Sequence, residues 1–151
     1  MSEVNPVKPW AKEDIDVVLT FLPTFEDPEF EAATWPKLED RIIDGVTVTP
    51  MPYPNYHPDV DDFFDAVATG YIDPYAPLPE DPTQEPVPFS VLGTHYPVEY
   101  FNTATLNQLR RYFILCKRGE RFCDGHIEGE FESGSIVAAL RRLRALRAAM
   151  P

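Results

Sequence analysis

Cysteine, histidine and long apolar runs are all scarce in this chain of 151 residues. Its two cysteines, Cys116 and Cys123, lie too far apart along a continuous helix to form a disulfide, so we expect a reduced, cytoplasmic protein. The three histidines have no paired ligand spacing, and we expect neither a metal nor a cofactor. The sequence has no basic segment followed by an apolar leader and no apolar stretch of about eighteen residues, which predicts no export and no membrane span.

Proline is missing from residues 98–150, although the chain holds 17 prolines in all. That uninterrupted stretch suits helices, because proline breaks a helix wherever it falls inside one. The prolines between residues 71 and 100 exclude a helix or a central strand there and predict a long loop that wraps over the core. Residues 1–11 are predicted to form a flexible N-terminal segment.

Apolar residues recur with the period of an amphipathic helix in several segments. One begins near Lys12 and has the inward set Ile15, Val18, Leu19 and Leu22; another follows Pro58 and has Val60, Phe63, Phe64 and Val67. The same spacing predicts helices after Thr103, from Glu120 to Phe131, and after Ser135. We therefore predict a mainly α fold of five or six helices in one compact domain (1–151), with a long Pro-rich loop and one short β-hairpin.

Residues 34–49 are predicted to form a short helix and then an extended segment. Pro36 suits a first helical position, and Leu38 and Ile42 lie about one turn apart, which indicates a helix over residues 34–43. After the Asp44-Gly45 turn signal, residues 46–49 are β-branched throughout, which favours a strand. The sequence does not identify the partner of that strand.

Charge is divided along the chain. Residues 1–104 hold four Lys or Arg against twenty Asp or Glu, and residues 105–151 hold nine against five, which gives −16 and +4 and the total of −12. If the fold keeps the two parts separate, the protein has an acidic body and a basic end that steer oppositely charged partners. The excess of acid argues against direct binding of nucleic acid.

Four groups of side chains are candidates for binding. The carboxylates of residues 59–65, with His57 beside them, could hold a cation or act as general acid and base, but acidic residues also simply favour the first turn of a helix. Cysteine with histidine could bind zinc, whereas buried cysteine behaves as a small hydrophobic residue. Arginines in the C-terminal part either form internal ion pairs or recognise phosphate or an acidic partner. Aromatic residues either cover the core or form an interface. We take as candidate binding residues Tyr53, Tyr56, Asp61, Asp62, Asp65, Arg118, Arg121, Arg141 and Arg144, and we predict no catalytic residue and no metal ligand.

Residues 118–126, Arg-Gly-Glu-Arg-Phe-Cys-Asp-Gly-His, precede Gly134 and the final amphipathic segment. This arrangement resembles the C-terminal part of a family of small bacterial proteins described only as a domain of unknown function, in which an Arg-x-x-Arg-Phe-x-x-Gly element precedes a Gly-led last helix. Residues 52–64, which are rich in proline and aromatic residues, are similar to the entry to that family's third element. The resemblance implies a helical fold and a bacterial, phage or mobile-element setting, and it implies no activity.

These observations predict an acidic, non-enzymatic accessory protein that acts by binding another protein. Its acidic surface could inhibit a partner by mimicking the charge of nucleic acid. The alternative is a small hydrolase or transferase that uses the Asp59–Asp65 carboxylates or the pair Arg118 and Arg121. The sequence does not choose a partner or an oligomeric state.

Overall fold

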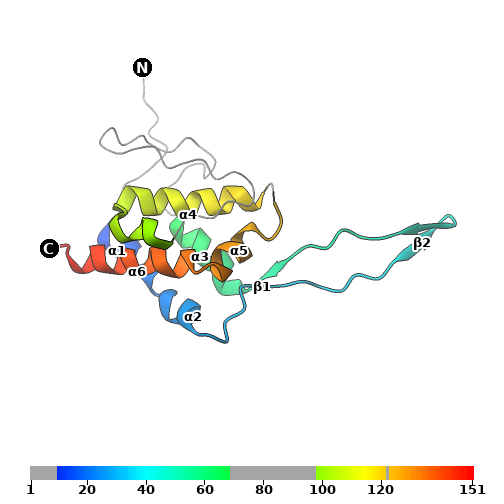
Figure 1. Cartoon of the computed structure of the whole chain (residues 1–151), viewed down its shortest axis with the longest axis horizontal. Helices are drawn as coiled ribbons and strands as arrows, with labels where there is room; N and C mark the ends of the chain where they lie inside the picture. Colours follow the sequence, from blue (N-terminus) through cyan, green and yellow to red (C-terminus); the bar gives the residue numbers. More distant parts are fainter. Residues whose placement is uncertain (1–9, 69–97, 122) are drawn as a thin grey trace, which may run out of the picture.

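A computed structural model describes residues 10–68, 98–121 and 123–151. The described residues form six α-helices and two sheets of two strands, so the predicted mainly α fold is confirmed (Figure 1). Along the chain the elements are α1 (Lys12–Leu19), α2 (Leu22–Glu26), β1 (Ala33–Thr34), β2 (Arg41–Ile43), β3 (Val46–Val48), β4 (Asn55–Tyr56), α3 (Pro58–Val67), the 3-10 helix η1 (Val98–Thr103), α4 (Leu106–Glu120), α5 (His126–Glu132) and α6 (Ser135–Ala148).

Local chemistry explains where helices α3 and α4 begin. His57 Nδ1 accepts a hydrogen bond from the Asp59 amide at 3.0 Å, and Pro58 occupies the first position of α3. Thr105 Oγ1 accepts from the Gln108 amide at 3.2 Å, while the Gln108 side chain accepts from the Thr105 amide at 3.0 Å. This reciprocal pair is a capping box that satisfies amide groups at the start of α4.

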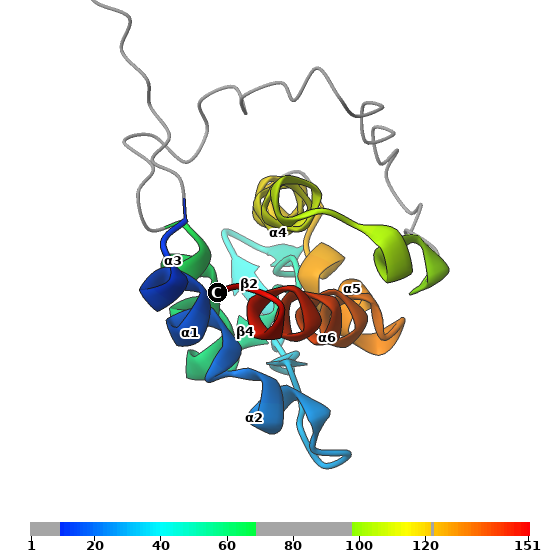
Figure 2. The same ribbon diagram turned by 90° about the vertical axis from the view of Figure 1, so that its left-hand side faces the viewer.

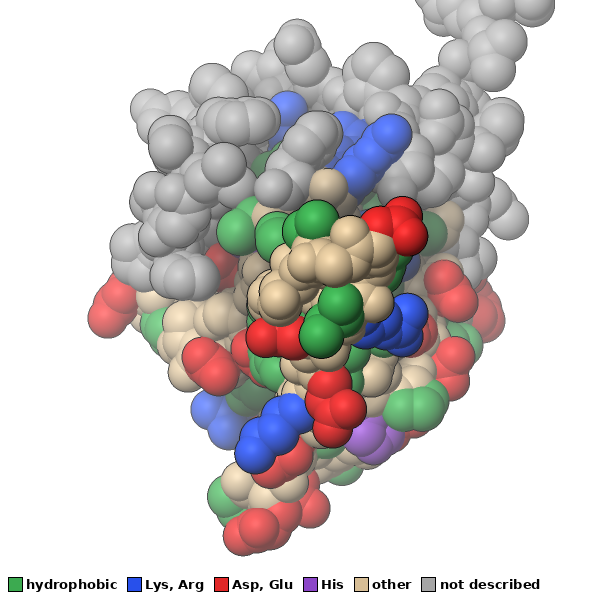
Figure 3. All heavy atoms as spheres, turned by 90° about the vertical axis from the view of Figure 1, so that its right-hand side faces the viewer, with side chains coloured by type: hydrophobic (Ala, Val, Ile, Leu, Met, Phe, Trp, Pro, Cys, Tyr) green, Lys and Arg blue, Asp and Glu red, His purple; other side chains and the backbone are tan. Residues whose placement is uncertain are grey.

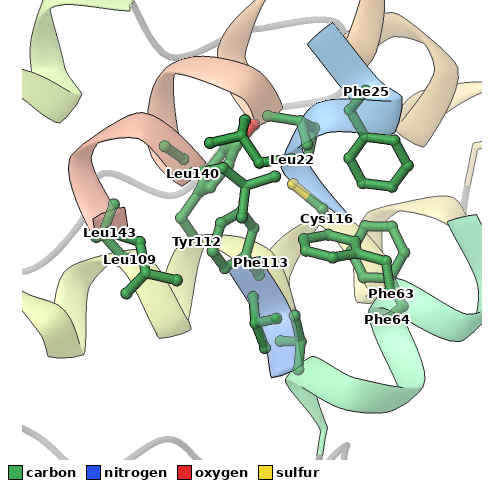
Figure 4. Packing of buried hydrophobic residues seen from close by; sticks show 14 of the residues in the cluster. Leu22, Phe25, Phe63, Phe64, Leu109, Tyr112, Phe113, Cys116, Leu140 and Leu143 are labelled. Atoms are coloured by element: carbon green, nitrogen blue, oxygen red, sulfur yellow. The ribbon is translucent and has the colours of Figure 1, made fainter. Parts of the chain in front are cut away.

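The helices pack around α6, which contacts α1, α2, α4, α5 and η1. Viewed end-on, α6 lies between α1 on one side and α5 on the other, with α4 above them (Figure 2). The predicted inward residues of α3 are all buried, and Phe63 meets Phe25 and Phe113 edge to face at 5.3 Å between ring centroids (Figure 4). Such aromatic contacts add to the free energy gained by burying the apolar surface.

The predicted helix over residues 34–43 is wrong. These residues are extended and end in strand β2, which pairs with β3. Asp44 and Gly45 both have positive φ, of 50° and 77°, and a two-residue turn of this kind brings the chain straight back as a hairpin. The β-branched Ile42 and Ile43 then find partners across the turn, and this cross-strand pairing outweighs the helical spacing of Leu38 and Ile42.

Three other predictions differ from the structure or lie outside it. The first predicted helix divides at Thr20 into α1 and α2, with Pro23 near the start of the second. Of the predicted flexible segment 1–11, residues 1–9 lie outside the described residues, whereas Trp10 is buried with the Arg110 guanidinium 4.9 Å from its ring. Of the predicted loop 71–100, residues 71–97 lie outside the described residues and 98–100 begin η1.

Candidate protein-binding site

A long hairpin, residues 33–56, projects from the helical body; we call it the arm (Figure 1). At its base Ala33 pairs with Tyr56, and near its tip Arg41 pairs with Val48. Arg41 is eight residues after Ala33 and Val48 is eight residues before Tyr56, so the two sides stay in register from base to tip. The arm is therefore one hairpin in which the ladder is interrupted.

The interruption coincides with prolines. Pro36 lies on the outgoing side, and Pro50, Pro52 and Pro54 lie on the returning side, between the two paired stretches. Proline has no amide hydrogen, so it cannot donate to a ladder, yet its fixed φ keeps the chain extended. The prolines therefore keep the arm extended and prevent strand pairing in its middle, whereas its base and its tip are paired.

The tip of the arm exposes apolar side chains. Every residue of β2 and β3 is exposed, and an isolated two-stranded hairpin buries too little surface to be stable by itself in water. Exposed apolar surface that clusters on a projecting element is typical of an interaction site. The exposed fractions are 78% for Ile42, 54% for Ile43, 62% for Val46, 41% for Val48 and 85% for Met51.

The base of the arm is anchored where α4 meets α5. The Tyr56 hydroxyl donates a hydrogen bond to Glu120 Oε1 and accepts one from the Glu128 amide at 3.3 Å. The same Glu120 carboxylate accepts from the amides of Gly125 and Ile127, each at 2.9 Å. One carboxylate therefore holds the start of α5 and the base of the arm together.

Trp35 makes a second anchor. Its indole Nε1 donates to Glu128 Oε1 at 3.0 Å, and its ring lies against Gly125 so closely that a Cβ there would be 3.0 Å from the ring. Gly125 also has φ of 89°, which favours glycine. Both anchors attach the arm to residues 118–128, the segment that carries the Arg-x-x-Arg-Phe-x-x-Gly element.

Burial, with the nearby Glu120 carboxylate as the next cause, raises the pKa of Tyr56 well above its usual value of 10.0. Loss of the phenol proton would place a second negative charge beside Glu120, and this is why the carboxylate raises the pKa of Tyr56. Tyr56 therefore stays a hydrogen-bond donor at neutral pH, which the anchor requires.

Two cavities adjoin strand β1 at the base of the arm, of about 560 Å³ and about 520 Å³. Both are lined by Phe30, Glu31, Ala33 and Thr34. The first adds Asp27, Glu29, Tyr56 and His57, and the second adds Trp35, Glu128, Phe131 and Glu132. Aromatic faces beside carboxylates suit the basic side chain of a partner.

The arginines of the C-terminal part meet carboxylates of the N-terminal part. Arg141 bonds Glu26 at 2.8 Å, Arg144 lies 4.0 Å from the same carboxylate, and Arg147 Nε bonds Asp16 at 2.8 Å. The expectation of an acidic body with a separate basic end is therefore not met along α6. On the face toward which the arm points, acidic and basic side chains also occur close together (Figure 3).

The structure places the other predicted residues in different parts of the molecule. Asp61, Asp62 and Asp65 lie on the exposed face of α3, and Arg118 and Arg121 lie in and just after the last turn of α4. Tyr53 is 49% exposed on the arm, whereas Tyr56 is half-buried at its base and contacts the α4–α5 junction.

Two of the alternatives considered for metal binding have structural roles here. His57 caps α3, and burial, with the Glu130 carboxylate as the next cause, raises the pKa of the Cys116 thiol well above its usual value. Within the described ranges no group of three or more His, Cys, Asp or Glu residues could hold a metal ion. No helix of the described chain is long and apolar enough to cross a membrane.

Sequence reasoning missed most of this site. The apolar tip was divided between a helix and an unpartnered strand, although Asp44-Gly45 between β-branched residues is a hairpin signal. No signal in the sequence indicated the anchors made by Trp35 and Glu120, because their partners lie 93 and 64 residues away along the chain.

Residues 81–149, fewer than half of the chain, match the model of a family of unknown function, DUF6508. Among the described residues, the matched segment supplies η1, α4, α5 and α6 down to Ala148, and so it contains the α4–α5 junction that anchors the arm. The arm itself lies outside the match. No curated protein and no solved structure matches the chain.

Proposed function

We propose that this protein is a cytoplasmic, non-enzymatic accessory protein of a bacterium, phage or mobile element, and that it acts by binding another protein through the tip of its arm. The observation that carries the proposal is the cluster of exposed apolar residues at the tip, Ile42, Ile43, Val46, Val48 and Met51. A hairpin that is anchored at its base, and whose tip no other part of the described chain covers, is suited to insertion into, or pairing with, a partner.

Capture experiments with matched variants test the proposal. The tip variant I42T/I43T/V46T removes apolar surface but keeps β-branched residues, so the hairpin is retained. The control V17T/V98T removes apolar surface from α1 and η1, where Val17 is 52% and Val98 43% exposed. Proteins from the source organism that bind the wild type and the control but not the tip variant are the expected partners; identical sets for all three forms would refute the role of the tip.

A narrower role rests on the acidic excess. The carboxylates Asp61 and Asp62 on the exposed face of α3 form a negative face that could cover a nucleic-acid site of the partner. Binding should then weaken steeply with added salt and be displaced by a polyanion such as heparin. Binding that is insensitive to both would leave the arm as the binding element and remove charge mimicry from the proposal.

The enzyme alternative has less support. It needs the Asp59–Asp65 carboxylates, His57, or Arg118 and Arg121 to line a pocket that admits a substrate. Of these residues, only His57 lines either of the two cavities beside β1, and its ring nitrogen caps α3.

A further inference from the structure

We propose that a second copy of this chain is a partner of the arm, and that the two copies pair edge to edge through β3 about a two-fold axis at Thr47. This inference deepens the proposed function, since it rests on the arm being a binding element. Four features of the tip carry it: the direction of its free backbone groups, its unprotected edge, its neutral charge and its distance from the body.

Geometry determines which backbone groups of the tip are free. A two-residue turn makes Ile43 and Val46 a hydrogen-bonded pair, and such pairs alternate along an antiparallel ladder. Ile42 and Thr47, which pair next, therefore direct their N–H and C=O groups outward, toward the two edges of the hairpin. Each edge can accept another antiparallel strand.

The two edges differ in protection. Edge strands usually avoid pairing by carrying charge or proline. The β2 edge carries Asp40 and Arg41, whereas residues 46–49 on the β3 edge, Val-Thr-Val-Thr, include neither charge nor proline. The β3 edge is therefore the one left open to a further strand.

That edge is also complementary to itself. In an antiparallel pair centred on Thr47, Thr47 faces the same residue of the second copy, and Val46 faces Val48 in both directions. The result is a four-stranded sheet with β-branched pairs across its centre, and sheets of three or more strands are stable where one hairpin is marginal.

Charge allows two tips to meet although the whole chain carries −12. Residues 41–49 contain one cation, Arg41, and one anion, Asp44, so the tip is neutral. Antiparallel pairing places the two bodies at opposite ends. The eleven residues from Thr34 to Asp44, which are ten steps of about 3.3 Å, hold each body roughly 33 Å from its tip. That distance is several times the Debye length of about 8 Å, so repulsion between the bodies is screened.

The contact is small. Pairing through β3, Val46–Val48, brings three residues of each copy together, against roughly 20–30 a side in a standard interface. We therefore expect a reversible dimer that forms as the protein is concentrated. Its shape is distinctive, since a dimer joined at the tips has about twice the maximum dimension of the monomer in small-angle X-ray scattering.

Sedimentation velocity from about 1 μM to about 1 mM tests the inference. The wild type should pass from monomer to dimer. Thr47→Lys and Thr47→Glu should each remain monomeric, because like charges would face each other across the two-fold axis, and an equal mixture of the two should dimerise again. The matched control Val17→Lys places the same charge on α1, outside the arm, where Val17 is 52% exposed, and it should dimerise like the wild type.

A wild type that stays monomeric throughout, a Thr47→Lys variant that still dimerises, or a mixture that stays monomeric would overturn the inference. None of these outcomes decides the proposed function, which the capture experiment tests separately. If the wild type is monomeric but the tip variant I42T/I43T/V46T still loses captured proteins, the arm binds a different protein; if neither effect is found, both proposals fail.

Discussion

At the residue scale, Tyr56 joins the arm to the body. Its hydroxyl is donor to Glu120 and acceptor for the Glu128 amide, and Glu120 in turn holds the amides at the start of α5. A hydrogen bond to a carboxylate is stronger than one between neutral groups, and leaving a half-buried carboxylate oxygen with fewer donors lowers stability. The position of the arm therefore depends on a contact between residues that are distant in the sequence.

Replacing Tyr56 by Phe should lower the free energy of unfolding by about 1 to 2 kcal/mol, because Glu120 loses one donor and the Glu128 amide loses its acceptor. Urea unfolding followed by circular dichroism measures the change. Tyr53→Phe is the control, since Tyr53 is 49% exposed on the arm and should change the value by less than about 0.5 kcal/mol. Equal effects of the two substitutions would contradict the role of Tyr56 as the anchor.

At the scale of elements, the helices and the arm behave differently. Each helix has apolar residues that reach the core, whereas the paired residues of the tip are all exposed. The tip is held by its own ladder and turn, and opening it does not uncover the core. Local opening of the tip should therefore be possible without global unfolding.

Gly45→Ala distinguishes the stability of the tip against local opening from the stability of the whole fold against global unfolding. Gly45 has φ of 77°, so alanine there should cost about 1 kcal/mol through backbone strain, and it would meet no atom within 4 Å. We expect faster amide hydrogen exchange at Ile43 and Val46 and an unchanged free energy of global unfolding. Gly134→Ala is matched in φ, 83°, and in open space, but it precedes α6, so it should lower global stability by about 1 kcal/mol. A global loss from Gly45→Ala would show that the tip is part of the core's cooperative unit.

How much of the fold could be predicted also depends on the kind of element. Helices α3 and α6 follow from local spacing, because their inward residues recur every three or four positions and all reach one core. The outgoing side of the arm was mistaken for a helix because its pairing depends on residues across a turn. The anchors could not be predicted at all, since Trp35 and Tyr56 meet Glu128 and Glu120 only after the helices have packed.

At the scale of the whole molecule, tyrosines in both the arm and the core have raised pKa values. Burial is the first cause that raises the pKa of Tyr56, Tyr100 and Tyr112 above 10.0, and nearby Glu120 and Glu130 act in the same direction at Tyr56 and Tyr112. Tyr112 is fully inside the core and donates to Glu130 Oε2 at 2.5 Å. The folded chain thus keeps phenol protons that the unfolded chain releases near pH 10.

The free energy of unfolding should therefore be constant with respect to these groups below about pH 10 and fall as the pH rises above it, because the folded state binds more protons than the unfolded state. Urea unfolding at a series of pH values from about 8 to about 11 measures the slope. Tyr56→Phe should show a shallower fall than the wild type, since it removes one of the three shifted groups. A stability that rises with pH above 10 would contradict the assigned direction of the pKa shifts.

Ion pairs attach the C-terminal helix α6 to the N-terminal helices α1 and α2. Arg141 and Arg147 of α6 bond Glu26 and Asp16, so much of the positive charge of the C-terminal part is balanced within the body. What remains distinctive at this scale is the arm, an anchored hairpin with a neutral, apolar tip, on an acidic helical body. The function proposed for the protein depends on that tip.

A binding titration with a captured partner tests this most directly, using the wild type, the tip variant I42T/I43T/V46T and the control V17T/V98T. We predict that the control binds with the affinity of the wild type, and that the tip variant binds at least about tenfold more weakly, because burial of the apolar tip is lost. All three forms should have the same melting temperature, since the substituted side chains lie outside the core. Equal affinities for the tip variant and the wild type would contradict the account.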